Sequence, residues 1–200
     1  MTNSILQDPL IRQKAIALLS EMNLDQKIGQ MTLSERLSIT PEEVRTFHIG
    51  GLLSGSGSFP GENLPADWVT MNDAYWAASI AGDEQHLAVP VLHGIHAIHG
   101  NNNVSGATIF PHNIGLGAAN DQELLKKVAM VTAREILATG VEWAFAPALA
   151  VARNIQWGRT YESYSEDSSI VASCAEGFVQ GLQGKFETSI NKKRNSYQFY

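Results

Sequence analysis

Three histidines occur at a spacing of three residues in the stretch HGIHAIHG, at His93, His96 and His99. On a helix, residues three apart share a face, so the three imidazoles could converge on zinc, which is bound by three histidines in known catalytic sites. Gly94 and Gly100 frame the stretch, which directly follows an apolar run typical of a strand. An extended segment would scatter the rings. We therefore hold a metal site as an alternative and favour histidines that hydrogen-bond the backbone or line a pocket.

A second candidate stretch is WGRTYESYSED, residues 157–167, in which Arg159 and several acids alternate with aromatic residues. A sugar offers an apolar face and a ring of hydroxyls, so aromatic faces and charged hydrogen-bonding groups suit it. Alternatively, Arg159 pairs with an acid of the same loop and holds its shape. Glu162, Glu166 and Asp167 could supply an acid/base pair, but no spacing sets the separation of roughly 5 Å or 6.5–9.5 Å that glycoside hydrolysis needs.

Further polar groups lie near the histidines, in Asn101-Asn102-Asn103 and His112-Asn113. Consecutive asparagines are common turn formers, and at the mouth of a pocket they suit a ligand with many hydroxyls. The sequence contains no nucleophile elbow, P-loop or dinucleotide-binding fingerprint.

The composition is that of a globular protein, with 44% apolar and 17% charged residues among 200. The net charge of −6 disfavours nucleic acid and anionic membranes as partners and is compatible with neutral substrates. The single cysteine, Cys174, excludes an internal disulfide, and we expect a buried thiol. No apolar segment approaches the roughly 18 residues of a membrane helix. The N-terminus has no basic region followed by an apolar run, so we expect a cytoplasmic location for the chain as written.

Helices and short buried strands alternate along the sequence, which favours parallel strands joined by helical crossovers. In such folds, ligands bind where loops leave the carboxyl ends of strands. The loops at about 94–119 and 147–167 both follow strands, so we expect them to meet on one face. The expected helices are 9–22, 24–31, one starting at Thr40-Pro41, 66–81, one starting at Asn120 or Asp121, and 168–182; the expected strands are 49–53, 87–92 and 141–146.

The final segment, KFETSINKKRNSYQFY, differs from the rest of the chain. It carries four basic side chains against one acidic side chain and has no apolar periodicity. We therefore expect one domain over residues 1–184, followed by a divergent, disordered basic tail over residues 185–200.

Several long stretches resemble one family. SGATIFPHNIGLGAANDQELL, ATGVEWAFAPALAVARNIQWGRTYESYSED and GLQG closely resemble the N-terminal domain of glycoside hydrolase family 3, the β-glucosidase and exo-glucanase family, over about residues 12–184. The resemblance implies an α/β fold, a partial (β/α)₈ TIM-type barrel made of the first several β/α units. It also implies a retaining hydrolase that releases glucose from non-reducing ends in carbohydrate metabolism, without a metal or other cofactor.

The resemblance implies a sugar-binding role for two residues. Arg159 in WGR matches a family arginine that hydrogen-bonds glucose, and His96 in GIHAIHG stands where the family has an aspartate that binds the outer hydroxyls of the sugar. His99 matches a family histidine, and His93 lies where an aromatic residue is common. A carboxylate accepts two strong hydrogen bonds, whereas a neutral imidazole offers one acceptor and one donor. We therefore expect His96 to weaken glucose binding by a few kcal/mol.

Other family residues have no counterpart among these 200. The resemblance implies a Lys-His pair, a nucleophilic aspartate in a Ser-Asp-Trp motif and a general acid/base, none of which occurs here at a matching position. A complete barrel takes about 250 residues. We therefore expect no catalytic residue in this chain and no activity by the chain alone, with a β-glucoside or oligosaccharide as ligand.

Three alternatives stay open at this stage. The chain could be a non-catalytic carbohydrate-binding fragment, or a separate chain could supply the missing remainder of the barrel. It could be a metal-binding protein that uses the histidine cluster. A frameshift or misjudged gene end could explain the tail, and a full-length relative could be secreted or periplasmic.

Overall fold

The computed structural model describes residues 8–55, 57–82 and 87–184. These described residues form two compact units, one within residues 8–52 and 74–91 and the other within residues 53–73 and 92–184. The predicted tail, residues 185–200, lies outside the described residues, so its disorder stays a prediction. Within the described part, no helix is long and apolar enough to cross a membrane.

Four short parallel strands form one sheet whose spatial order follows the chain. In the second unit, β3 pairs with β4, with Gly94 opposite Trp143 and Ile95 opposite Ala144. Helices separate the strands in sequence, which confirms the predicted α/β class with parallel strands. The strands are β1 (Leu33–Glu35), β2 (Gly51–Ser54), β3 (Leu92–Ile95) and β4 (Trp143–Ala144).

The helix starts follow local capping signals. The Asp8 side chain accepts a hydrogen bond from the backbone of Leu10 at the start of α1. Reciprocal capping boxes, Asn23 with Gln26 and Thr40 with Glu43, begin the next two helices. The first unit thus contains α1 (Pro9–Glu21), α2 (Leu24–Gln30), the 3₁₀ turn η2 (Arg36–Ser38) and α3 (Pro41–Thr46), while α4 (Pro65–Ile80) continues from the second unit into the first.

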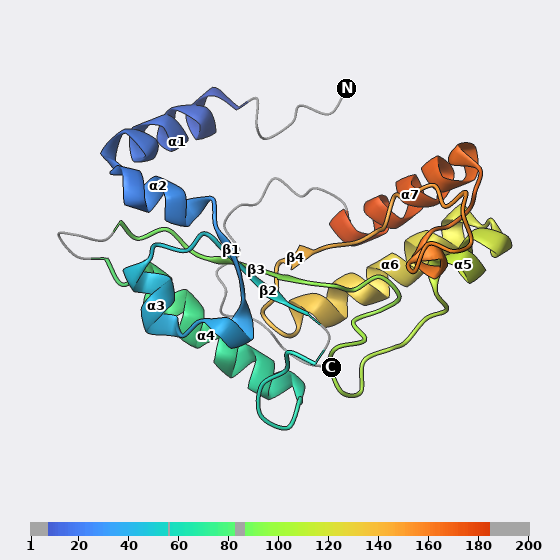
Figure 1. Cartoon of the computed structure of the whole chain (residues 1–200), viewed down its shortest axis with the longest axis horizontal. Helices are drawn as coiled ribbons and strands as arrows, with labels where there is room; N and C mark the ends of the chain where they lie inside the picture. Colours follow the sequence, from blue (N-terminus) through green and yellow to red (C-terminus); the bar gives the residue numbers. More distant parts are fainter. Residues whose placement is uncertain (1–7, 56, 83–86, 185–200) are drawn as a thin grey trace. The chain divides into compact units, whose positions relative to one another are not determined.

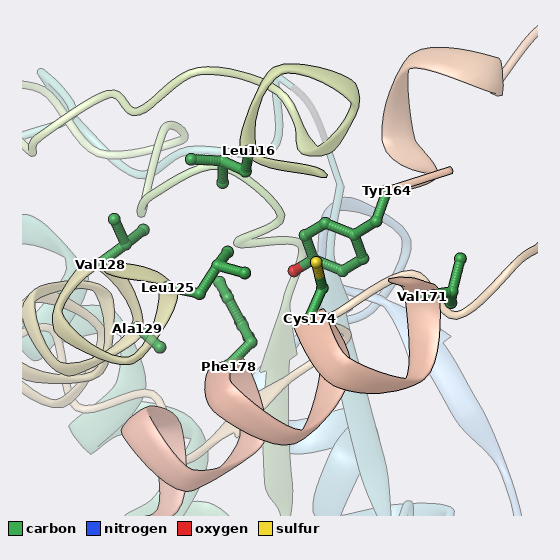
Figure 2. Packing of buried hydrophobic residues seen from close by; sticks show 8 residues of the cluster. All are labelled: Leu116, Leu125, Val128, Ala129, Tyr164, Val171, Cys174 and Phe178. Carbon is green, nitrogen blue, oxygen red and sulfur yellow. The ribbon is translucent and has the colours of Figure 1, made fainter. Parts of the chain in front are cut away.

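The main core of the second unit lies between α6 (Gln122–Leu137) and α7 (Ser168–Gln183), which run side by side (Figure 1). Glycines of α7 permit this approach, because a Cβ at Gly177 or Gly181 would lie within 3.0 Å of backbone oxygens of α6. Buried side chains fill the space between the two helices and around α5 (Asn113–Ala119) (Figure 2). They are Leu116, Leu125, Val128, Ala129, Tyr164, Val171, Cys174 and Phe178. The burial predicted for Cys174 is confirmed.

A second cluster packs around β3. It joins Trp68 of α4 to Ile95 and Val141, all fully buried. The indole nitrogen of Trp68 donates to the side-chain oxygen of Asn63 (2.8 Å), which satisfies the polar atom of this buried ring.

Three predicted boundaries were wrong. The predicted strand 87–92 is not a strand, and β3 begins at Leu92, so that His93 lies inside the strand instead of after it. The helix α5 occupies part of the predicted loop 94–119. The strand predicted at 141–146 is reduced to Trp143–Ala144, and β1 was not predicted.

Candidate functional site

A cavity of about 370 Å³ lies where the chain leaves β3 and where the long loop after β4 returns. The first segment contributes His96, His99 and His112, and the second contributes Arg159 and the 3₁₀ turn η3 (Thr160–Glu162). The prediction that these two loops meet is therefore confirmed. The complete lining is Gly55, His96, Ile98, His99, Asn102, Asn103, His112, Arg159, Tyr161 and Glu162.

The helix α5 holds the second loop in place. The side-chain amide of Asn113 donates to the backbone oxygen of Glu162 (2.7 Å), and both residues are buried. Gly117 lies so close to the backbone of Tyr164 that a Cβ there would have no room. Within the loop, the Ser163 hydroxyl donates to the backbone oxygen of Ala150 (2.6 Å). The geometry of η3 thus depends on α5 as well as on its own turn.

Arg159 makes a two-pronged ion pair with Glu162. Its Nε donates to Oε1 (3.0 Å) and its Nη2 donates to Oε2 (2.5 Å). These bonds raise the pKa of the Arg159 guanidinium. The arginine side chain is 57% exposed and the glutamate side chain only 10%. Arg159 is therefore held in place by an acid of its own loop, which agrees with the interpretation that it maintains the shape of the loop. It also lines the cavity, which agrees with the interpretation that it binds a ligand.

The three acids of this loop do not form an acid/base pair in the cavity. Of Glu162, Glu166 and Asp167, only Glu162 belongs to the cavity lining. Asp167 instead caps α7, where its carboxylate accepts from the backbone nitrogen of Ser169 (2.7 Å). The side-chain and backbone hydrogen bonds from Ser169 lower the pKa of Asp167.

The histidines at 93, 96 and 99 are separated by the structure. His93 is buried, where its Nδ1 meets the side-chain oxygen of Asn72 and its Nε2 meets the hydroxyl of Ser54 (2.8 Å). His96 and His99 line the cavity instead. The helical arrangement on which the metal hypothesis depended is absent, and the described residues contain no group of three or more His, Cys, Asp or Glu side chains suited to a metal ion.

His112 and Tyr161 join His99 in a row of rings that the sequence did not predict. The His99 and His112 rings have centroids 4.0 Å apart, and Tyr161 meets His112 edge-on at 4.7 Å. Burial, and then the neighbouring His99, lower the pKa of His112. Only the folded loops bring the two imidazoles face to face.

The three consecutive asparagines differ in role, because one is buried within the fold and two line the cavity. Asn101 is fully buried, and its amide approaches the backbone oxygen of Glu135 (3.4 Å). Asn102 and Asn103 line the cavity, and the amide nitrogen of Asn103 has no hydrogen-bond partner within the described chain. The expectation that these residues offer polar groups to a pocket therefore holds for two of the three.

Comparison with known proteins identifies the family. Residues 23–193 match the family described as "Glycosyl hydrolase family 3 N terminal domain". The chain belongs to glycosyl hydrolase family 3. A lysosomal beta glucosidase of Dictyostelium discoideum is 32% identical over 194 residues, which cover 87% of this chain and 23% of that protein. Relatives in family 3 are therefore much longer than the matched region.

Solved family 3 structures share the fold. The exo-1,3/1,4-beta-glucanase ExoP from a Pseudoalteromonas species superposes with a TM-score of 0.82 and 41% identity, covering 88% of this chain and 22% of that chain. A beta-glucosidase from Listeria innocua, solved in complex with isofagomine, gives a TM-score of 0.66 and 27% identity over 86% of this chain and 23% of that one. The parallel sheet therefore corresponds to part of the family 3 barrel, as predicted. The chain spans less than a quarter of the length of these relatives.

Proposed function

We propose that this chain forms the sugar-binding part of a family 3 glycosidase that hydrolyses β-glucosides from non-reducing ends with retention. The observation that carries the proposal is the cavity in which the fixed Arg159–Glu162 pair faces the histidines that follow β3. The relatives support it, since they include beta glucosidases and an exo-1,3/1,4-beta-glucanase, and the Listeria innocua enzyme has been solved with glucose.

Arg159 is the principal sugar-binding residue in this proposal. Glu162 holds two of its guanidinium nitrogens, and Nη1 makes no hydrogen bond within the described chain, so it is available to a sugar hydroxyl. Because the side chain is already ordered, binding sacrifices little conformational entropy. His96 supplies one donor and one acceptor at the same cavity, which makes it a weaker partner for two hydroxyls than a carboxylate.

Hydrolysis by this chain alone is not expected. A retaining mechanism needs a carboxylate nucleophile and a second carboxyl about 5–5.5 Å away. Among the described residues, Glu162 is the one carboxylate in the cavity lining, and both of its oxygens are bonded to Arg159. The proposal therefore assigns sugar binding to these 200 residues and assigns the reacting carboxylates to residues outside them.

Calorimetric titration of the 200-residue chain with D-glucose tests the binding role. Arg159→Ala should weaken glucose binding by about tenfold or more, because hydrogen bonds to charged groups contribute about 1.5–3 kcal/mol. Arg153→Ala is the matched control, since Arg153 is an exposed arginine of the same loop and does not line the cavity. Equal affinities of the two variants for glucose would contradict the assignment of Arg159.

Hydrolysis of a chromogenic aryl β-glucoside by the same protein tests the catalytic part. No turnover is expected from the unmodified chain. Turnover that disappears in Glu162→Gln would show that the chain contains a reacting carboxylate and would overturn the binding-only role.

A further inference from the structure

One wall of the cavity is made of aromatic rings. Tyr161, the middle residue of η3, and His112, which immediately precedes α5, both line the cavity. Tyr161 is 45% exposed. An aromatic side chain that is this exposed in a cavity favours a ligand that covers it with an apolar group, because the ring surface then leaves water. The Tyr161 ring therefore adds apolar binding surface to a site whose other assigned contacts are hydrogen bonds.

Contacts from two directions fix the Tyr161 ring. Its own turn is held against α5 by the hydrogen bond from the Asn113 side chain to the backbone oxygen of Glu162 (2.7 Å). The ring itself meets the His112 ring at a centroid distance of 4.7 Å and an interplanar angle of 73°. His112 in turn lies against the His99 ring, with centroids 4.0 Å apart. A ring held in this way loses little conformational freedom when a ligand binds.

The contact with His112 leaves stacking surface on the tyrosine. In a T-shaped pair the edge of one ring faces the plane of the other, so His112 covers at most one of the two faces of the Tyr161 ring. Within the described chain, the Tyr161 side chain makes no hydrogen bond that would fix it in another role. Aromatic pairs attract beyond the area that they bury when their centroids lie about 4.5–7 Å apart. A planar ring of a ligand could take up this position on the free face.

The polar and the aromatic parts of the lining suit different parts of a glycoside. Arg159, Asn102 and Asn103 offer hydrogen-bonding groups for the hydroxyls of the sugar. The face of the Tyr161 ring offers no such group, and it matches a planar apolar substituent attached to the sugar. The cavity volume of about 370 Å³ lies in the range of about 300–1,000 Å³ for pockets that enclose drug-sized ligands. The cavity therefore has room for a group beyond one sugar ring.

We propose that Tyr161 determines the aglycone preference of this site by stacking on an aromatic ring, so that the cavity favours aryl β-glucosides over alkyl β-glucosides. His112 is a positioning residue in this inference, since it holds the Tyr161 ring. The inference rests on the proposed function, because it narrows the substrate class of the same neutral β-glucoside site.

Calorimetric titrations with phenyl β-D-glucoside and methyl β-D-glucoside test the preference, because the two ligands share the same neutral sugar. The 200-residue chain should bind the phenyl glucoside about three- to tenfold more tightly, as expected for one aromatic pair. Tyr161→Leu keeps an apolar side chain but removes the ring, so it should reduce this ratio to less than about twofold. Tyr161→Phe keeps the ring and should retain the ratio of the unmodified chain.

Two further variants control for the loop and for the ring contact. Trp157→Leu should leave the ratio unchanged, because Trp157 is an exposed aromatic residue of the same loop that lies outside the cavity lining. His112→Ala should lower the ratio, because the tyrosine loses the ring that holds it. The His112 side chain makes no capping hydrogen bond at the start of α5, so this variant leaves the helix start intact. An unchanged ratio in His112→Ala would overturn the positioning role.

The outcomes separate this inference from the proposed function. Glucose binding that depends on Arg159, combined with equal affinities for the phenyl and methyl glucosides, would overturn the inference alone. Failure to bind glucose and both glucosides would overturn the proposed function as well. If Tyr161→Leu weakened the binding of both glucosides by the same factor, the ring would contact the sugar itself, and the aglycone assignment would be wrong.

Discussion

The contact between α5 and the η3 loop should be destroyed by one methyl group, in the variant Gly117→Ala. A Cβ at position 117 would lie within 3.0 Å of the backbone oxygen, carbonyl carbon and Cα of Tyr164, distances that real Cβ atoms do not show. Since these neighbours are backbone atoms, no side-chain rotation can relieve the clash. Either α5 or the segment around Tyr164 must move.

The expected loss of stability combines three effects. Inserting a methyl group into a well-packed contact costs about 1–3 kcal/mol. Moving the two backbones apart also weakens the hydrogen bond from Asn113 to the backbone of Glu162, which contributes about 1 kcal/mol. Alanine gains up to about 1 kcal/mol over glycine within a helix. We therefore expect Gly117→Ala to lower the free energy of unfolding by about 1–3 kcal/mol.

Gly115→Ala is the matched control, because it lies two residues away on the same helix. A Cβ at position 115 would meet only the Cβ of Pro111, at an ordinary distance of 3.5 Å. This variant should gain about 0.5–1 kcal/mol from helix propensity alone. Urea unfolding followed by tryptophan fluorescence measures both changes, and glucose titration should show weaker binding only in Gly117→Ala. Equal stabilities of the two variants would refute the role assigned to the α5–η3 contact.

Other variants test the buried polar groups. Tyr164→Phe should raise the free energy of unfolding by about 1 kcal/mol in urea titration, because the buried hydroxyl has no partner within the described chain. Asn72→Leu should lower the free energy of unfolding by about 2–3 kcal/mol, because Asn72 links His93 to the backbone oxygen of Thr139. Unchanged stability of this variant would exclude that link. Burial raises the pKa of the Cys174 thiol, so alkylation at about pH 8, followed by mass spectrometry, should be slow in the native chain and fast in urea; equally fast native labelling would show that the thiol is accessible.

Long helices were predictable because their signals are local. Asp121 and Asp167 each precede a helix and accept a hydrogen bond from its first turn, as a residue at that position should. The helix α5 was missed because its seven residues include two glycines and show no clear apolar stripe. Its position depends on distant partners, since Asn113 bonds to the backbone of Glu162, 49 residues away.

The position of β3 shows the limit of hydrophobic patterning. The apolar run at 87–92 resembled a buried strand, but the paired strand continues through His93 and Gly94. A histidine can be buried there because Ser54 and Asn72 satisfy both ring nitrogens, and they lie 39 and 21 residues away. Gly94 fits because the Phe145 ring occupies the space that a Cβ would need. Neither condition is visible in a local pattern.

For the site, the sequence predicted which loops meet but not which side chains pair. The alternation around Arg159 and the histidines after an apolar run both pointed to a shared face, and the cavity contains both groups. Three acids of the loop were equal candidates for a partner of Arg159. Glu162 is the partner because the short turn η3 places it three residues away on the same side, whereas Asp167 is committed to capping α7.

The charge that a ligand meets is a local property of the cavity and is not set by the net charge of −6. Exposed charges are screened over about 8 Å at physiological ionic strength, so acids elsewhere on the surface contribute little inside the site. What remains is Arg159 with its inward-facing partner Glu162, and the imidazoles of His96, His99 and His112. The net charge was compatible with neutral substrates, but these five side chains, and not the acids elsewhere on the surface, set the charge that a ligand of the cavity meets.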